Sequence, residues 1–228
     1  MRIVLINPNT SAQTTEMMVD IARAVVPAGV TVDGVTAASG VPMIVTPEEL
    51  DAAGPGVVAM GVAEAASADG IIVGAFGDPG IEELQARVSI PVVGICEGSA
   101  LEAARGERRF GIATVTPLLK EAIEARVRQL GLGDLYTGLR LTPGEPRDLS
   151  SQPERLEDEL AIAVSRCLED DKAQAVVIGG GPLGQAAIAL SRRFEEPLIA
   201  PVPAALGILL EQIAAGRKVR SEDRLVRT

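Results

Sequence analysis

The sequence predicts an α/β protein made of two similar halves, each a parallel sheet flanked by helices. Three segments return in degenerate form: residues 1–11 as 108–118, 68–78 as 173–183, and 88–100 as 194–206. Short β-branched runs alternate with helical patterns, which is typical of βαβ units. The chain has three Phe, one Tyr and no Trp, so its core must consist of Val, Ile, Leu and Ala, as in sheets covered by helices.

The first half is expected to contain four strands alternating with helices. Each strand is a short apolar run, and the first helix follows a capping residue, Thr10 or Ser11. Residues 37–55 are rich in Gly, Pro and acidic residues, so we expect a loop or lid with a short helical turn. The expected strands are 2–6, 30–36, 70–75 and 91–95, and the expected helices are 11–26, 56–68, 80–88 and 97–105.

The second half repeats this scheme, with a loop at 142–153 and a charged tail at 217–228 that packs back or frays. The expected strands are 110–114, 135–141, 173–178 and 197–199, and the expected helices are 117–130, 154–170, 183–193 and 203–215. We expect residues 1–105 and 207–228 to form the first half, and residues 106–206 the second.

Composition and motifs exclude several classes of function. The net charge is −10 with no histidine, so neither nucleic acid nor an anionic membrane is an expected partner. No metal or cofactor is expected, because transition-metal ligand spacing, a dinucleotide fingerprint and the lysine of a P-loop are all missing. No segment approaches a membrane span, and the first apolar run is too short for a signal peptide. We expect a cytoplasmic homo-oligomer that acts on a small molecule.

Four predicted strand ends are rich in Gly, Pro, Thr and Asn: 7–10, 75–80, 114–117 and 179–182. Ligands of open parallel sheets bind beyond the carboxyl ends of the strands. Small residues also let backbone N–H groups approach a ligand, and each loop opens a helix whose N-terminus favours an anion. Ordinary strand-to-helix turns use the same residues, but their placement in both halves predicts one site in the cleft between the halves.

Four motifs together resemble the aspartate/glutamate/hydantoin racemase superfamily, and most closely its hydantoin and allantoin racemase branch. They are INPNTS at the first strand end, AFGDPG after the third strand, PVVGICE at the fourth, and the glycine block after AVVIG. The resemblance covers nearly the whole chain. It implies a cofactor-independent enzyme in which one cysteine thiolate removes a proton beside a carbonyl while a second thiol delivers one to the opposite face.

The sequence departs from this pattern at both cysteine positions. The first cysteine corresponds to Ala75 and the second to Gly180, and neither side chain can transfer a proton. The second block is also rebuilt, with Gly181 and Pro182 following Gly180. We therefore favour natural divergence over a laboratory knock-out, and we exclude racemisation by the cysteine pair.

Three other groups are candidates for acid/base chemistry. Asp78 follows Ala75 by three residues, although it can instead cap the helix at 80–88. Glu97 begins the helix after the fourth strand, where a carboxylate also complements the helix dipole. Cys96 is either an inert buried thiol or a nucleophile whose pKa is lowered by the helix N-terminus. Cys167, inside a helix, is expected to be structural.

The predicted ligand anchors follow the same strand ends. The resemblance assigns Asn7 to ligand binding, and Thr114 is its counterpart in the second half. Glu48 falls where the resemblance implies an aromatic residue, so it either meets an amine, acts as a base or is a solvated helix-start residue. The expected substrate-binding residues are Asn7, Glu48, Phe76, Gly77, Thr114, Val115, Thr116 and Gly181.

Three hypotheses follow. The first is an enzyme that acts on a carbon next to a carboxylate, amide or imide, as a racemase, isomerase or lyase without the cysteine pair. Backbone N–H groups would stabilise its enolate-like intermediate, and one residue would move the proton. The second hypothesis is a catalytically silent binder of a small metabolite. The third is an engineered racemase whose cysteines were replaced by Ala75 and Gly180.

Overall fold

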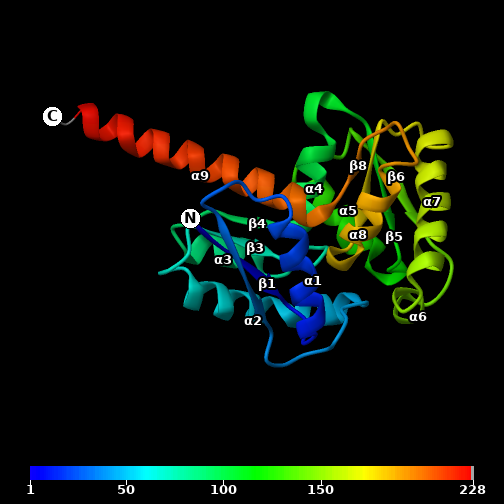
Figure 1. Ribbon diagram of the computed structural model, residues 1–228, viewed down its shortest axis with the longest axis horizontal. Helices are drawn as coiled ribbons and strands as arrows, with labels where there is room; N and C mark the ends of the chain where they lie inside the picture. The colour runs from blue at the N-terminus through cyan, green and yellow to red at the C-terminus, as the bar shows by residue number, and fades with distance from the viewer. Residues whose placement is uncertain (227–228) are drawn as a thin grey trace.

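The computed structural model describes the backbone of residues 1–226 and the side chains of residues 1–216. Two four-stranded sheets lie side by side, with helices packed around them (Figure 1). The strand orders are β2-β1-β3-β4 and β6-β5-β7-β8, and every strand pairing is parallel. These two parallel sheets flanked by helices confirm the predicted fold class.

The first half contains β1 to β4 and α1 to α4. Its elements are β1 (Arg2–Asn7), α1 (Ala12–Arg23), β2 (Thr31–Thr36), α2 (Pro47–Glu64), β3 (Gly70–Val73), α3 (Ile81–Arg87), β4 (Val92–Gly94), α4 (Ile95–Ala103) and the 3₁₀ turn η1 (Arg105–Glu107).

The second half repeats the arrangement and ends in a long helix. Its elements are β5 (Phe110–Thr114), η2 (Pro117–Leu119), α5 (Lys120–Gln129), β6 (Tyr136–Leu141), α6 (Pro146–Ser150), α7 (Pro153–Glu169), β7 (Ala175–Gly179), η3 (Gly181–Leu183), α8 (Gly184–Leu190), β8 (Leu198–Ile199) and α9 (Pro201–Val226).

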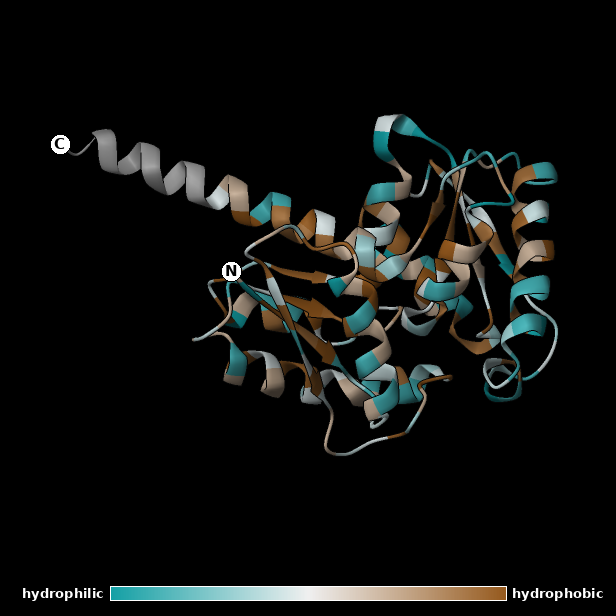
Figure 2. Ribbon diagram, in the orientation of Figure 1, coloured by the Kyte–Doolittle hydropathy of each residue, from teal (hydrophilic) through white to brown (hydrophobic). Residues whose placement is uncertain are grey.

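The central strands are apolar along their length because helices cover both faces of each sheet. All residues of β3, β5 and β7 are buried, and the strands stand out as the most hydrophobic segments in Figure 2. The pairings Ile6 with Val73 and Thr114 with Gly179 bring neighbouring strands to the same level. The loops after β1 and β3, and after β5 and β7, therefore leave their sheets together.

Helix α2 begins nine residues earlier than the sequence pattern indicates. A loop or lid with a short helical turn was expected at 37–55, but α2 begins at Pro47 and continues through Pro55 to Glu64. Thr46 accepts a hydrogen bond from the Glu49 backbone N–H, and the Glu49 side chain accepts one from the Thr46 N–H. This capping box fixes the helix start, and the helix continues through Gly54, Pro55 and Gly56, residue types that usually interrupt a helix.

Two more segments are more helical than expected. The expected loop at 142–153 contains α6, whose first turn is capped by the Glu145 side chain. Helix α9 continues to Val226, so the backbone of the expected tail is helical up to that residue; residues 227–228 lie outside the described part. Helix α9 packs against α4 and lies beside β3 and β4 (Figure 1); the assignment of residues 207–228 to the first half stays a prediction.

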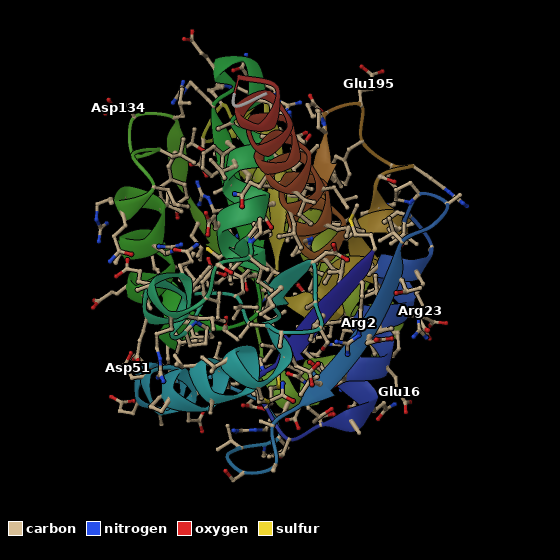
Figure 3. The ribbon with its side chains drawn as sticks, turned by 90° about the vertical axis from the view of Figure 1, so that its left-hand side faces the viewer. Arg2, Glu16, Arg23, Asp51, Asp134 and Glu195 are labelled. Atoms are coloured by element: carbon tan, nitrogen blue, oxygen red, sulfur yellow. The ribbon has the colours of Figure 1, made fainter. Side chains whose placement is uncertain are left out.

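The apolar core is continuous between the halves. One cluster of buried side chains includes Leu5 and Ile72 of the first sheet and Ile112 and Val177 of the second. Charged side chains such as Glu16, Asp51, Asp134 and Glu195 lie at the outside (Figure 3). Among the described residues, no helix is long and apolar enough to cross a membrane.

Candidate active site

A cavity of about 80 Å³ lies where the strand-end loops of the two halves meet. We call it the inner cavity. Its walls come from the loops after β1, β3, β5 and β7, together with Met43, Ile44, Leu50 of α2 and Ser150 of α6. Ala75 and Gly180 both line it, as the internal repeat predicts. The two positions to which the resemblance assigns the cysteine pair therefore share one pocket.

The backbone at Gly180 does not suit a side chain. Its φ is +145° and its ψ is 130°, a region that is essentially restricted to glycine. A Cβ atom there would also lie 3.1 Å from Leu183 Cδ1. A cysteine at this position would therefore strain the turn as it stands.

Four of the predicted binding residues line the inner cavity: Phe76, Val115, Thr116 and Gly181. Among the hydrogen bonds of the described residues, none uses the backbone N–H of Phe76, Gly180 or Gly181. All three residues line the inner cavity, so their N–H groups are candidate donors to a ligand there. Preorganised N–H groups of this kind stabilise a carbonyl oxygen or an oxyanion.

Asn7 and Thr114 lie behind the cavity walls, in the strand ends from which the lining loops leave. Both are fully buried and do not line the inner cavity. The Asn7 Nδ2 group contacts Asn9 Oδ1 at 2.9 Å and the Ser11 carbonyl oxygen at 3.0 Å. The Thr114 hydroxyl donates to the Gly179 carbonyl oxygen at 2.6 Å. These side chains therefore hold the loops together.

Glu48 and Gly77 lie elsewhere. Glu48 is exposed in the first turn of α2 and lines a separate surface cavity, which agrees with a solvated helix-start residue. Gly77 faces a third cavity, on the side of Asp78 and Arg126.

Asp78 is the centre of a buried ionic cluster. One of its carboxylate oxygens accepts the Cys96 backbone N–H at 2.9 Å, and the other accepts the Glu97 N–H at 2.8 Å. Asp78 therefore caps α4, whereas the sequence suggested α3, whose N-cap is Gly80 without a side-chain hydrogen bond. Arg126 of α5 lies 3.2 Å from Asp78 and 3.0 Å from Glu97. This ion pair joins the two halves.

Burial raises the pKa of Asp78 to about 6, against the opposing effect of the Cys96 N–H and Arg126. Burial likewise raises the pKa of Glu97, although Arg126 opposes it. The pKa of Cys96 is raised well above its ordinary value, first by burial and then by the Asp78 charge. Of the two alternatives for Cys96, these shifts favour the inert buried thiol: burial is the main reason that its pKa is raised and not lowered, and the Asp78 charge adds to it.

None of these three acid/base candidates lines the inner cavity. Cys167 is also buried, and burial raises its pKa to about 12. In the described part of the chain, no three His, Cys, Asp or Glu side chains gather in a way that would hold a metal ion.

Sequence reasoning missed Asn9, Thr14, Met43 and Ser150, which line the inner cavity. Asn9 belongs to the same NPNT motif as Asn7, so the motif indicated the loop but not which asparagine lines the cavity. Met43 and Ser150 lie in segments expected to be loops, where no periodicity indicates the direction of a side chain.

Comparisons with known proteins agree with this geometry. The family model described as Asp/Glu/Hydantoin racemase matches residues 3–209. The chain is 27% identical to the hydantoin racemase of Pseudomonas sp. (strain NS671), over 96% of this chain and 88% of that protein. The allantoin racemase structure from Klebsiella pneumoniae has a TM-score of 0.89 at 29% identity, covering 95% of this chain and 89% of that one.

The allantoin racemase structure from Pseudomonas fluorescens has a TM-score of 0.90 at 26% identity and covers 95% of this chain and 92% of that one. Family model and structures agree over nearly the same residues and include every loop of the inner cavity. This chain belongs to the Asp/Glu/hydantoin racemase family.

Proposed function

We propose that this protein binds a neutral cyclic amide or imide, such as a hydantoin, in the inner cavity and does not racemise it with paired thiols. One observation carries the proposal. Among the described residues, none of those that line the cavity has an ionisable side chain. A ligand there meets amide, hydroxyl and backbone groups, and no proton carrier that titrates near neutral pH.

The hydrogen bonds around the cavity indicate what kind of ligand it accepts. Asn9 Oδ1 already accepts from Asn7 Nδ2 and from the Ser11 N–H, each at 2.9 Å, so its Nδ2 group remains free to donate. The N–H groups of Phe76, Gly180 and Gly181 are further donors. These groups suit the carbonyl oxygens of a ligand.

Three hydroxyl groups are left as acceptors. The Ser150 hydroxyl donates to the Pro146 carbonyl oxygen at 2.8 Å, and the Thr14 hydroxyl donates to Ser11 Oγ at 2.9 Å. The Thr114 hydroxyl donates its proton to the Gly179 carbonyl oxygen. In the 3.4 Å contact between the Thr114 and Thr116 hydroxyl oxygens, Thr116 is therefore the donor. The remaining lone pairs suit ligand N–H groups. A carboxylate offers acceptors only, whereas a cyclic amide or imide offers both N–H and C=O.

An enzyme with a single proton-transferring residue is the alternative. The free N–H groups favour it, because they stabilise an enolate-like oxyanion as well as a carbonyl. However, Asp78, Glu97 and Cys96 are held beside Arg126 and the N-terminus of α4. Moving one of them into the inner cavity would break this cluster, so we place binding ahead of catalysis.

Calorimetric titration with unsubstituted hydantoin tests the proposed function. We expect binding by the native chain, and at least ten-fold weaker binding by Thr116→Val, which removes an acceptor from the cavity. Thr31→Val is the matched control, because Thr31 is exposed on β2 and does not line the inner cavity. Absence of hydantoin binding, or equal loss in both variants, would contradict the proposal. The homo-oligomer and the cytoplasmic location are also proposals, and light scattering tests the first.

A further inference from the structure

The loop between β3 and α3 belongs to the walls of two separate cavities. Ala75 and Phe76 line the inner cavity. Residues 77–83, together with α2 and α5, line a cavity of about 500 Å³, which we call the lateral cavity. Leu50 of α2 lines both cavities. A group in the lateral cavity can therefore influence the inner cavity through this loop, without touching a ligand there.

The shape of the loop depends on Asp78. Its φ of 54° lies in the left-handed region, which is uncommon for a residue other than glycine. Its carboxylate fits against β4 because Gly94 has no side chain; a Cβ atom there would overlap the carboxyl group. The Asp78 backbone N–H donates to the Ala75 carbonyl oxygen at 3.0 Å. One turn therefore joins the Asp78 carboxylate, which caps α4, to the wall of the inner cavity.

Arg126 holds Asp78 from the other half of the chain. It is the one cationic residue among those described as lining the lateral cavity, and its side chain is buried beside Asp78. The titratable groups that line this cavity or contact Asp78 are Asp51 of α2, Glu82 and Glu83 of α3, Cys96 and Glu97 of α4, and Arg126 of α5. Without Arg126, the Asp78 charge would face only carboxyl groups and a thiol. Arg126 does not line the inner cavity, so it can act on a ligand there only through the loop.

We propose that Arg126 is a positioning residue for the inner cavity: through Asp78, it holds the 75–80 loop in the shape that presents the Phe76 N–H group to the ligand. The inference rests on the proposed function and adds its regulation, because ligand affinity then depends on the ionised pair. A protonated Asp78 offers fewer acceptor sites to the two α4 N–H groups and loses its attraction to Arg126. Burial favours this neutral form, so the chain can gain the proton without unfolding.

Charge variants of Arg126 test the positioning role in calorimetric titrations with hydantoin at pH 7.5. We expect Arg126→Met to bind at least five-fold more weakly than the native chain, and Arg126→Lys, which keeps the charge, to stay within three-fold. Val127→Ala is the matched control, because Val127 is buried on the same helix and its truncation lowers stability but leaves the ion pair in place. Melting curves establish that each variant is folded at the temperature of the titration.

Three outcomes are decisive. Native affinity in Arg126→Met, or an equal loss in Val127→Ala, would overturn this inference alone. Absence of hydantoin binding by the native chain would overturn the proposed function and, with it, the positioning role.

The pH profile of binding separates positioning from a purely structural role. No residue described as lining the inner cavity is ionisable, and hydantoin stays uncharged between pH 5 and pH 7.5. We expect the native chain to bind hydantoin at least three-fold more weakly at pH 5 than at pH 7.5, and Asp78→Asn to bind equally at both. In Arg126→Met the step should move to higher pH, because Arg126 lowers the pKa of Asp78. A native profile without a step, or an unchanged step in both variants, would overturn the inference.

Discussion

Replacing Arg126 with Met removes the cationic partner of a buried carboxylate while keeping most of the side-chain volume. The Arg126 side chain is 10% exposed, and the Asp78 side chain is 0% exposed. Removing one partner of a buried pair costs about 3–5 kcal/mol, because the other charge is left uncompensated. Asp78 keeps the N–H bonds from Cys96 and Glu97, so we expect the lower end of this range, about 3 kcal/mol.

For a chain of this length, about 3 kcal/mol corresponds to a fall in Tm of about 6–12 °C. Differential scanning calorimetry at pH 8 measures this loss. Arg128→Met is the matched control, since Arg128 lies on the same helix and is exposed, and we expect it to stay within about 0.5 kcal/mol of the native chain.

The loss should also depend on pH. At pH 5, Asp78 is largely protonated because its pKa is about 6, so removing Arg126 leaves less uncompensated charge. We therefore expect the difference between Arg126→Met and the native chain to shrink from pH 8 to pH 5. Equal melting of the Arg126 and Arg128 variants, or a difference that grows on acidification, would refute this reasoning.

Three further predictions concern the cavity and its supports. Gly180→Cys should lower stability by about 1–3 kcal/mol in chemical denaturation, because φ is +145° there; a stability equal to that of Ala75→Cys would contradict the strain. Asn7→Ala should lower the free energy of unfolding by about 2 kcal/mol, because it leaves buried groups unpaired. Asn9→Ala should mainly weaken hydantoin binding. If Asn7→Ala mainly weakened binding and Asn9→Ala mainly lowered stability, the supporting and binding roles would be assigned to the wrong residues. The Asp78 carboxyl carbon should titrate near pH 6 by NMR. Because this pKa is above that of the same group in the unfolded chain, acidification from pH 7 to pH 4 should increase the contribution of Asp78 to the free energy of unfolding by up to about 3 kcal/mol. If the measured pKa were below that of the unfolded chain, acidification would lower this contribution instead.

Much of the fold followed from the repeat and from strand periodicity. The buried runs of β3 and β7 have the apolar composition of strands covered on both faces, and their shared position in the two halves predicted that Ala75 and Gly180 line one cavity. The pattern did not predict the start of α2, because the Gly and Pro residues at 54–56 usually interrupt a helix. The capping box at Thr46 and Glu49 is the local signal that marks this start.

The direction of Asp78 could not be predicted from its distance to Ala75. Its φ of 54° turns the chain sharply, and its carboxylate reaches the N-terminus of α4 instead of the inner cavity. Spacing along the chain does not specify such a turn, and neither does it show that Arg126, 48 residues later, completes the cluster. Sequence placed these groups near the cleft, but only the structure shows which side of the loop they face.

Deuterium exchange at the ring carbon next to the carbonyl of hydantoin tests the central claim most directly. Proton NMR in D₂O follows this signal with the ligand saturated by the protein. If the cavity holds no proton carrier, the protein binds the ligand and the signal decays no faster than in buffer alone. Faster decay in the presence of the native chain would show that a residue reaches the ring carbon, and the binding-only function would be wrong.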